Sequence, residues 1–328
     1  MTEGCVDFHT HFIDASMEGV SLPRCVTLKR RGVDGELLRD GATYRTIDDR
    51  TWNVDRRIAD MDAEGVSLQV LSPVPVTYAY EATPGDALVH ARAQNDALAA
   101  VVRSRPDRFA ALGTVPLQDV DLACAELQRA MAQLGLSGVE IGTTAGGREL
   151  DDPAFEPFWE RCAAHDAIVF VHPESAPGFD RLRRRMMVIS TGYPSETGIA
   201  GAALLTSGLL ERHALRVVLA HGGGTLPWLL PRLDRLWDID PELQQAARRP
   251  SEGAKSLYCD SLVFDDRNLG LVLERFGPTR VVVGSDYPFP IREVPVGAVA
   301  RAAGRLGADL RAGNALRLLR QTHGGFVA

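Results

Sequence analysis

The sequence of 328 residues is short of lysine and carries no excess of positive charge. Only Lys29 and Lys255 are lysines, so nearly all of the 36 basic residues are arginines, whose planar guanidinium groups suit carboxylate binding. The net charge of -7 argues against a broad surface for nucleic acid or anionic lipid. We therefore expect a small-molecule substrate and neither nucleic acid nor membrane as a partner.

Cysteine pairs and long apolar runs are also lacking. The five cysteines are odd in number and widely spaced without a C-x-x-C pair, which predicts neither a disulfide framework nor a cysteine metal site. The chain has no apolar run near the roughly 18 residues needed to cross a bilayer. Its start, MTEGCVDFHTHF, lacks the basic and apolar segments of a signal peptide. We expect a cytoplasmic protein.

Internal repeats, low-complexity tracts and linker-like stretches are absent as well. The composition, 45% hydrophobic and 24% charged, is that of an ordinary globular protein. Although 328 residues exceed the usual size of one core, (β/α)8 barrels reach this length as one domain. We expect a single domain over residues 1–328.

Short β-branched runs alternate with amphipathic helical stretches along the whole chain, a pattern typical of βα units around a parallel sheet. Eight such runs predict a distorted (β/α)8 TIM barrel in the α/β class. The runs start at Cys5, Val66, Phe109, Ser137, Ala167, Arg216, Ser256 and Arg280. Helices are predicted over 86–105, 119–134, 154–165, 196–211, 226–238, 266–276 and 295–305. Two long stretches, 14–49 and 174–195, break the alternation and are expected as insertion loops after strands 1 and 5.

Histidine and aspartate stand at the ends of several predicted strands. In a parallel barrel these carboxyl ends form the active-site face, and residues i and i+2 of a strand share a face. His9 and His11 should therefore point into the barrel mouth together, where His172 and Asp286 would complete a metal site. Three imidazoles and one carboxylate suit Zn²⁺, and also Mn²⁺, Fe²⁺ or Co²⁺.

His221 opens the run His221-Gly222-Gly223-Gly224. A histidine followed by glycines also occurs in esterase oxyanion loops, but that fold requires a G-x-S-x-G elbow, which the chain lacks. The glycines favour a sharp backbone turn at the barrel rim. His221 is then a candidate general base beside the metal, and a fourth histidine ligand is the competing role.

Four segments carry a family resemblance: VDFHTHF, VFVHP, LAHGGG and VVGSDYPFP. Together they resemble the amidohydrolase-related metal-dependent decarboxylases. The resemblance continues through RRIADMDAEGVSLQV at 56–70, VPLQDVDLAC at 115–124 and TLPWLLPRLDRLW at 225–237, and so covers most of the chain.

This resemblance implies a barrel with one divalent metal ion and no organic cofactor. It assigns the metal to His9, His11, His172 and Asp286, and catalysis to His221 together with Asp286. It also implies that Arg57 and Arg232 bind a substrate carboxylate, with Arg232 reaching the neighbouring site of a homodimer, and that Phe289 forms an aromatic wall.

Two acidic residues lie outside that pattern. Glu140 stands where binuclear amidohydrolases place a carboxylated lysine, so a mononuclear site is expected, with Glu140 as a rival bridging ligand. Glu174 follows His172-Pro173, where the family often has tryptophan and aspartate. The resemblance therefore indicates the class of reaction more firmly than the identity of the substrate.

The expected reaction is the nonoxidative decarboxylation of a small unsaturated or aromatic carboxylic acid. Two routes are open: addition of water after His221 takes its proton, or direct protonation of the carbon that bears the carboxylate. Hydrolysis of an amide, lactone or imine is the main alternative, and hydration of a double bond is another. A noncatalytic barrel would differ by lacking a metal with an open coordination position.

Overall fold

The computed structural model describes residues 4–301 and 303–322. Eight of its strands pair in parallel, and they coincide with the eight predicted runs. They are β1 (Cys5–Phe12), β5 (Val66–Pro73), β6 (Phe109–Ala111), β7 (Gly138–Ile141), β10 (Ile168–Val171), β11 (Arg216–Leu219), β12 (Tyr258–Asp260) and β13 (Val281–Val282).

These strands follow one another in the order of a TIM barrel. They form two sheets, β1-β5-β6 and β13-β12-β11-β10-β7. An isolated bridge from Gly113 to Val139 joins β6 to β7, and another from Thr10 to Tyr287 joins β1 to the segment after β13. Neighbouring strands along the chain are therefore neighbours in space, and their carboxyl ends lie on one face.

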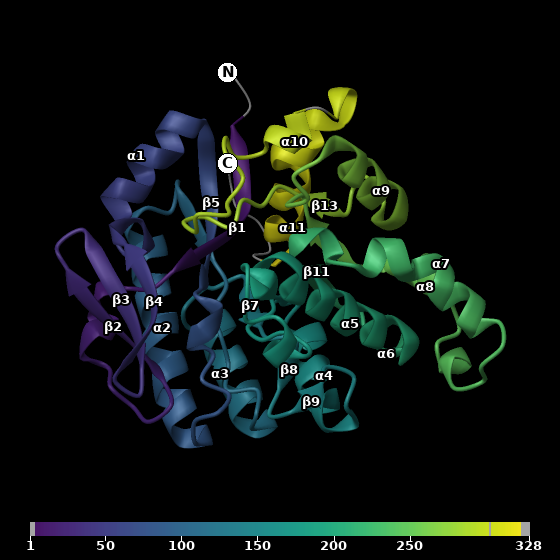
Figure 1. The fold of residues 1–328 in the computed structure, drawn as a ribbon, viewed down its shortest axis with the longest axis horizontal. Coiled ribbons are helices and arrows are strands. Elements are labelled where there is room, and N and C mark those ends of the chain that lie inside the picture. Colours follow the sequence, from purple (N-terminus) through teal and green to yellow (C-terminus); the bar gives the residue numbers. More distant parts are fainter. Residues whose placement is uncertain (1–3, 302, 323–328) are drawn as a thin grey trace.

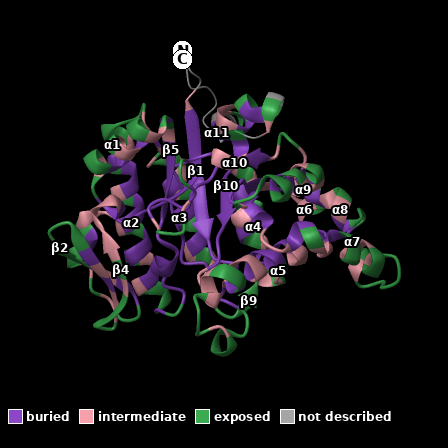
Figure 2. Cartoon of the chain, turned by 45° about the horizontal axis from the view of Figure 1, so that its top comes forward, coloured by how far each residue is buried: buried purple, intermediate pink, exposed green. Residues whose placement is uncertain are grey.

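Helices surround these strands (Figure 1), and in Figure 2 the central strands are buried whereas the outer helices carry exposed faces. The helices are α1 (Val54–Glu64), α2 (Pro84–Ser104), α3 (Val120–Ala132), α4 (Glu156–Ala164), α5 (Tyr193–Thr206), α6 (Leu209–Arg212), α7 (Leu226–Trp237), α8 (Pro250–Gly253), α9 (Asp266–Phe276), α10 (Ala298–Arg301) and α11 (Asn314–Thr322).

Two predicted helices differ from those observed. The helix predicted over 196–211 begins earlier and is divided into α5 and α6, because Gly208 adopts a left-handed conformation with φ of 72°. The helix predicted over 295–305 is reduced to α10 and a 3-10 turn at Gly304–Leu306, and residue 302 lies outside the described residues.

The first insertion is not a loop, which corrects the prediction for residues 14–49. It forms an antiparallel sheet of β2 (Val26–Arg31), β3 (Asp34–Arg39) and β4 (Ala42–Asp48), on the left of Figure 1. Val26, Leu28 and Leu37 bury one face of this sheet. The second insertion is irregular, with a 3-10 turn at Phe179–Arg181 and a π-helical turn at Val188–Gly192, while the predicted loop residues 193–195 belong to α5.

An apolar cluster fills the interior between the strands. It includes Phe8 and Phe170, whose rings meet edge to face with centroids 5.9 Å apart. Ala315 and Leu318 of α11 belong to the same cluster, so α11 packs against one end of the strands. The Phe170 ring also lies 5.0 Å from the His9 ring, so this core forms the floor under the opposite, carboxyl-terminal end.

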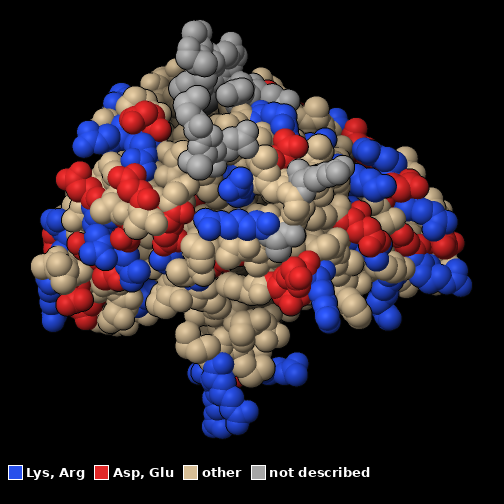
Figure 3. All heavy atoms as spheres, turned by 90° about the horizontal axis from the view of Figure 1, so that it is seen from above, with Lys and Arg blue, Asp and Glu red and all other residues tan. Residues whose placement is uncertain are grey.

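Acidic and basic side chains are interspersed over most of the face seen in Figure 3. Exposed pairs such as Arg30 with Glu18 at 2.9 Å are screened by solvent and stabilise the fold little, so apolar burial is the larger contribution to stability. Over residues 4–301 and 303–322, we find no helix that is both long enough and apolar enough to span a membrane.

Candidate metal centre and active site

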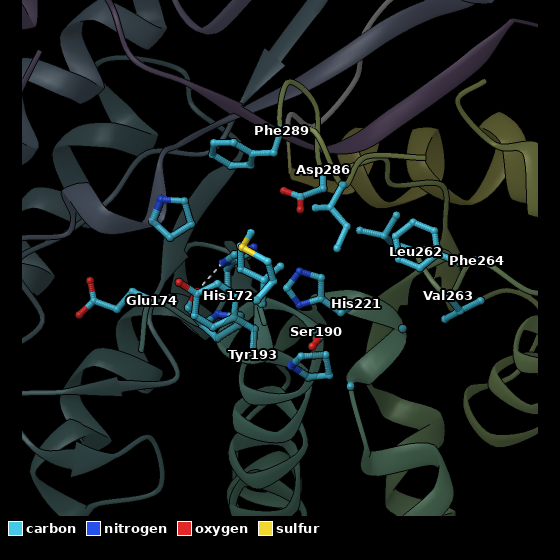
Figure 4. A pocket seen from close by; sticks show the side chains of 18 of the residues that line it. His172, Glu174, Ser190, Tyr193, His221, Leu262, Val263, Phe264, Asp286 and Phe289 are labelled. Atoms are coloured by element: carbon cyan, nitrogen blue, oxygen red, sulfur yellow. Dashed lines mark hydrogen bonds between the residues drawn. The ribbon is translucent and has the colours of Figure 1, made fainter. Parts of the chain in front are cut away.

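A cavity of about 830 Å³ opens at the carboxyl ends of the strands. Figure 4 shows His172, His221 and Asp286 around this space, with Phe289 beside them. Apolar side chains make up much of the remaining wall: Val76, Met186, Ile189, Trp228, Leu262, Val263, Phe264 and Ile291. A mostly apolar cavity with a few converging polar groups is the usual form of a small-molecule site.

The four predicted metal ligands come together at the base of this cavity. One ligand atom from each of His9, His11, His172 and Asp286 lies within 4.8 Å of the others, and all four residues are buried. The Nε2 atoms of His9 and His11 are 3.1 Å apart, and His11 Nε2 is 3.2 Å from Asp286 Oδ1. The strand-end spacing therefore produces the expected cluster.

Hydrogen bonds at Nδ1 orient all three imidazoles. His9 Nδ1 donates to Asp260 Oδ2 at 2.7 Å, and His11 Nδ1 donates to the Pro73 carbonyl at 2.9 Å. His172 Nδ1 donates to the Pro173 carbonyl at 2.9 Å. A neutral imidazole with its proton on Nδ1 presents its lone pair at Nε2, as metal-binding histidines require.

Unpaired buried atoms show that a metal ion fits this arrangement. Among the described residues, His172 Nε2 and Asp286 Oδ1 have no hydrogen-bond partner although both are buried. Burial, reinforced by the adjacent imidazoles, keeps the pKa of His172 well below its usual range, so its ring is neutral. Buried acceptors of this kind are costly unless a cation or a donor satisfies them, and a divalent ion suits three imidazoles and a carboxylate.

His221 lies beside the four ligands without joining them. Its ring centroid is 4.9 Å from that of His172, and it lines the cavity. The convergent ligand set does not include His221, which favours the base over the fourth-ligand role. Burial lowers the pKa of His221 to about 4, and the nearby His9 contributes to the same shift.

A left-handed turn holds His221 at the cavity edge. Its φ is 56°, and Gly222, Gly223 and Gly224 also have positive φ. At Gly224 a Cβ atom would collide with the Pro194 carbonyl, so glycine is required for steric as well as conformational reasons. The sharp turn expected from the glycine run is confirmed.

Glu140 is buried behind the ligands. Its Oε2 lies 3.8 Å from His11 Nδ1, on the side of the ring away from the metal-facing Nε2, and Oε1 accepts a hydrogen bond from the Tyr78 hydroxyl. Burial raises its pKa. Because the carboxylate faces Nδ1, the geometry does not support the bridging role considered for Glu140.

Arg45 is the one arginine of the described residues that lines the cavity. It comes from β4, and its guanidinium lies 4.8 Å from the centre of the Phe289 ring. Phe289 stands in the cavity wall as predicted, 5.2 Å from the His11 ring. Arg45 was not predicted from the sequence, because it lies in the first insertion, outside the segments that carry the family resemblance.

Arg57 lies elsewhere, which corrects its predicted contact with substrate. Its side chain is completely buried and does not line the cavity. Its guanidinium donates to the His11 carbonyl at 2.5 Å, the Arg50 carbonyl at 3.1 Å and Gln69 Oε1 at 3.1 Å. Arg57 therefore supports the backbone of a metal ligand.

Two further predicted positions differ in their relation to the cavity. Arg232 is exposed on α7 and does not line the cavity of its own chain. Glu174 lines the cavity, but Figure 4 shows its carboxyl group directed away from the imidazoles. Burial raises the pKa of Glu174 to about 7.

Known relatives identify the family. Residues 6–321 match the amidohydrolase family, and the chain belongs to it. The chain is 34% identical to a 2-amino-3-carboxymuconate-6-semialdehyde decarboxylase of Dictyostelium discoideum, across 96% of this chain and 91% of the relative. The resemblance to the metal-dependent decarboxylases is thereby confirmed.

Solved structures agree. The 5-carboxyvanillate decarboxylase of Sphingomonas paucimobilis is 25% identical, with a TM-score of 0.82 over 97% of this chain and 99% of that one. A 5-carboxyvanillate decarboxylase mutant of Novosphingobium aromaticivorans is also 25% identical, with a TM-score of 0.73 over 83% and 82% of the two chains. That structure contains manganese and 3-methoxy-4-hydroxy-5-nitrobenzoic acid.

We expect the protein to bind one divalent ion per chain through this cluster. His172→Ala should weaken binding by more than about 100-fold, because it removes a ligand rather than a supporting contact. His213→Ala is the matched control, since His213 bonds Glu156 outside the cavity. Chelator competition followed by elemental analysis measures both, and equal metal affinity in the two variants would contradict the assignment.

Arg57→Ala should lower the free energy of unfolding by about 3 kcal/mol or more, because it leaves buried acceptors without a donor. Arg45→Ala, which removes a half-buried side chain at the cavity, should cost about 1 kcal/mol or less. Urea unfolding compares the two. Equal stability would show that the internal contacts of Arg57 are unimportant.

Proposed function

We propose that the protein is a metal-dependent nonoxidative decarboxylase of a small unsaturated or aromatic carboxylic acid, acting in the breakdown of aromatic compounds. The observation that carries this proposal is the convergence of His9, His11, His172 and Asp286 in the cavity, with His221 beside them. The decarboxylases that resemble the chain over most of its length support it.

Zn²⁺ is the ion we propose for the site, since three imidazoles and one carboxylate are a common zinc ligand set. The manganese in one structural neighbour supports Mn²⁺ as the alternative. A divalent ion held there would act as a Lewis acid and lower the pKa of a coordinated water.

His221 is the group we assign to proton transfer. Its lowered pKa keeps the imidazole neutral at neutral pH, as a general base must be before it accepts a proton from a water or the substrate in the cavity. When the bond between the substrate carbon and its carboxylate breaks, carbon dioxide leaves and the electron pair stays on the carbon. His221 then gives its proton to that carbon and becomes neutral again.

Arg45 and Phe289 would recognise the substrate. A guanidinium group binds a carboxylate through two parallel hydrogen bonds, and Arg45 lines the cavity. The Phe289 ring, which lies between Arg45 and His11, offers a flat apolar surface to a planar conjugated acid. Arg45 thus takes the place that the sequence prediction gave to Arg57.

A homodimer would bring Arg232 to the neighbouring site. Trp228 lies one turn before Arg232 on α7, is 79% exposed and lines the cavity. Ile239, just beyond α7, is 60% exposed. Large apolar side chains exposed on one helix and just beyond its end are typical of an interaction surface, which supports contact between α7 and a second copy.

We also infer that the eight parallel strands form one closed, distorted barrel in a single domain. The isolated bridges at both joins between the sheets support closure. A cytoplasmic location is supported by five free cysteines, of which Cys124 alone is not buried, because thiols persist in reducing compartments.

Metal-loaded protein should release carbon dioxide from 2-amino-3-carboxymuconate-6-semialdehyde or from a hydroxylated or aminated aromatic acid, as mass spectrometry of the products would show. His221→Ala should lower kcat by at least about 100-fold with metal still bound. A product that gains water and keeps its carboxylate would indicate the hydrolase or hydratase instead. An active, metal-loaded His221→Ala variant would contradict the role of His221.

Arg45→Ala and Arg232→Ala should each raise KM about tenfold or more, because each removes a charged partner of the carboxylate. Unfolding and remixing Arg232→Ala with His221→Ala chains tests whether Arg232 acts across the interface. With substrate well below KM, where Arg232→Ala chains alone are nearly inactive, random heterodimers would regain one intact site and give about a quarter of wild-type activity. No recovery after proven subunit exchange would place Arg232 in its own site or outside catalysis.

A further inference from the structure

Asp260 is a buried carboxylate that links the metal cluster to the turn bearing His221. It ends β12, which pairs with β11 and β13. Its side chain has no exposure to solvent and does not line the cavity. It is therefore outside the ligand set and out of reach of a substrate.

Four donors share its two oxygens. Oδ2 accepts from His9 Nδ1 at 2.7 Å and from the His221 backbone N–H at 2.8 Å. Oδ1 accepts from the Gly222 N–H at 2.8 Å and the Leu262 N–H at 3.0 Å. One oxygen thus contacts both the imidazole of a metal ligand and the backbone of the residue that carries the base.

The bonds at His221 and Gly222 explain how the turn keeps its shape. Both residues are left-handed, at φ of 56° and 64°, and a non-glycine residue adopts this conformation only when its surroundings hold it. Two successive N–H groups pointing at one carboxylate supply that support. The His221 imidazole is therefore placed through its own backbone.

We propose that Asp260 is a positioning residue with two effects: it strengthens metal binding through His9 and sets the position of His221 through the turn. The second effect rests on the proposed role of His221 as the base. Neither effect requires Asp260 to touch metal or substrate. The two effects are coupled because Asp260 Oδ2 accepts hydrogen bonds from both His9 and the His221 backbone.

Asp260→Asn is the test, since it keeps the size of the side chain and removes one acceptor oxygen with the charge. In either amide orientation, His221 or Gly222 loses its acceptor. Metal affinity should fall about 10–100-fold, as for other groups that orient a ligand. With the site saturated by added Zn²⁺, kcat should remain about 100-fold low, because His221 is misplaced.

Glu126→Gln is the matched control. Glu126 is also fully buried and bonded, but to Asn95 and Arg129 around α2 and α3, away from the cavity. It should lose stability while keeping metal affinity and kcat. If metal affinity and kcat changed equally in the two variants, Asp260 would contribute only to the stability of the fold.

The two proposed effects of Asp260 can be disproved independently of each other. Metal affinity within twofold of wild type in Asp260→Asn would overturn the effect on His9, and full recovery of kcat at saturating Zn²⁺ would overturn the effect on His221. Chelator competition needs no substrate, so it remains decisive if the protein proves not to be a decarboxylase. If Asp260→Asn does not fold, ¹⁵N NMR of the wild type replaces it: a hydrogen-bonded His9 Nδ1–H resonance supports the contact, and its absence overturns it.

Discussion

Three hydrogen bonds that point away from the cavity determine what the cavity can bind. His9, His11 and His172 each donate from Nδ1 to a fixed acceptor in the surrounding structure. Because the two nitrogens of an imidazole lie on different sides of the ring, an anchored Nδ1 also directs Nε2. The inward lone pairs are thus arranged by the fold, and their close approach is tolerable only where a cation can join them.

Two of these three acceptors come from strands other than the one that carries their ligands. Pro73 ends β5 and serves His11 of β1, and Asp260 ends β12 and serves His9 of β1. Arg57 adds a contact from α1 to the His11 carbonyl. The positions of the ligands at the end of β1 therefore depend on how β5, β12 and α1 pack around them. A substitution that disturbs this packing would also displace the ligands.

The barrel strands were predictable because they are short apolar runs that alternate with helical stretches. The ligand cluster was predictable because its members stand at the ends of those runs. The sheet of β2 to β4 was not, because most of β4 is exposed and shows no alternation of apolar residues. Arg57 was misassigned because sequence cannot distinguish an arginine that binds internal carbonyls from one that faces a ligand. Asp260, like Asp286, stands at the end of a predicted strand, but it was not singled out because it lies outside the segments that resemble the family.

The sheet of β2 to β4 keeps one proposed recognition residue, Arg45, apart from the barrel strands that carry the cluster. It carries Arg45 to the cavity, whereas His9, His11, His172 and Asp286 belong to the barrel strands or the turns that follow them. If Arg45 binds the substrate as proposed, we expect changes in the length or sequence of this insertion to alter which acids are accepted while the metal cluster stays intact. One barrel could thus give rise to enzymes for different acids by altering a single attached module.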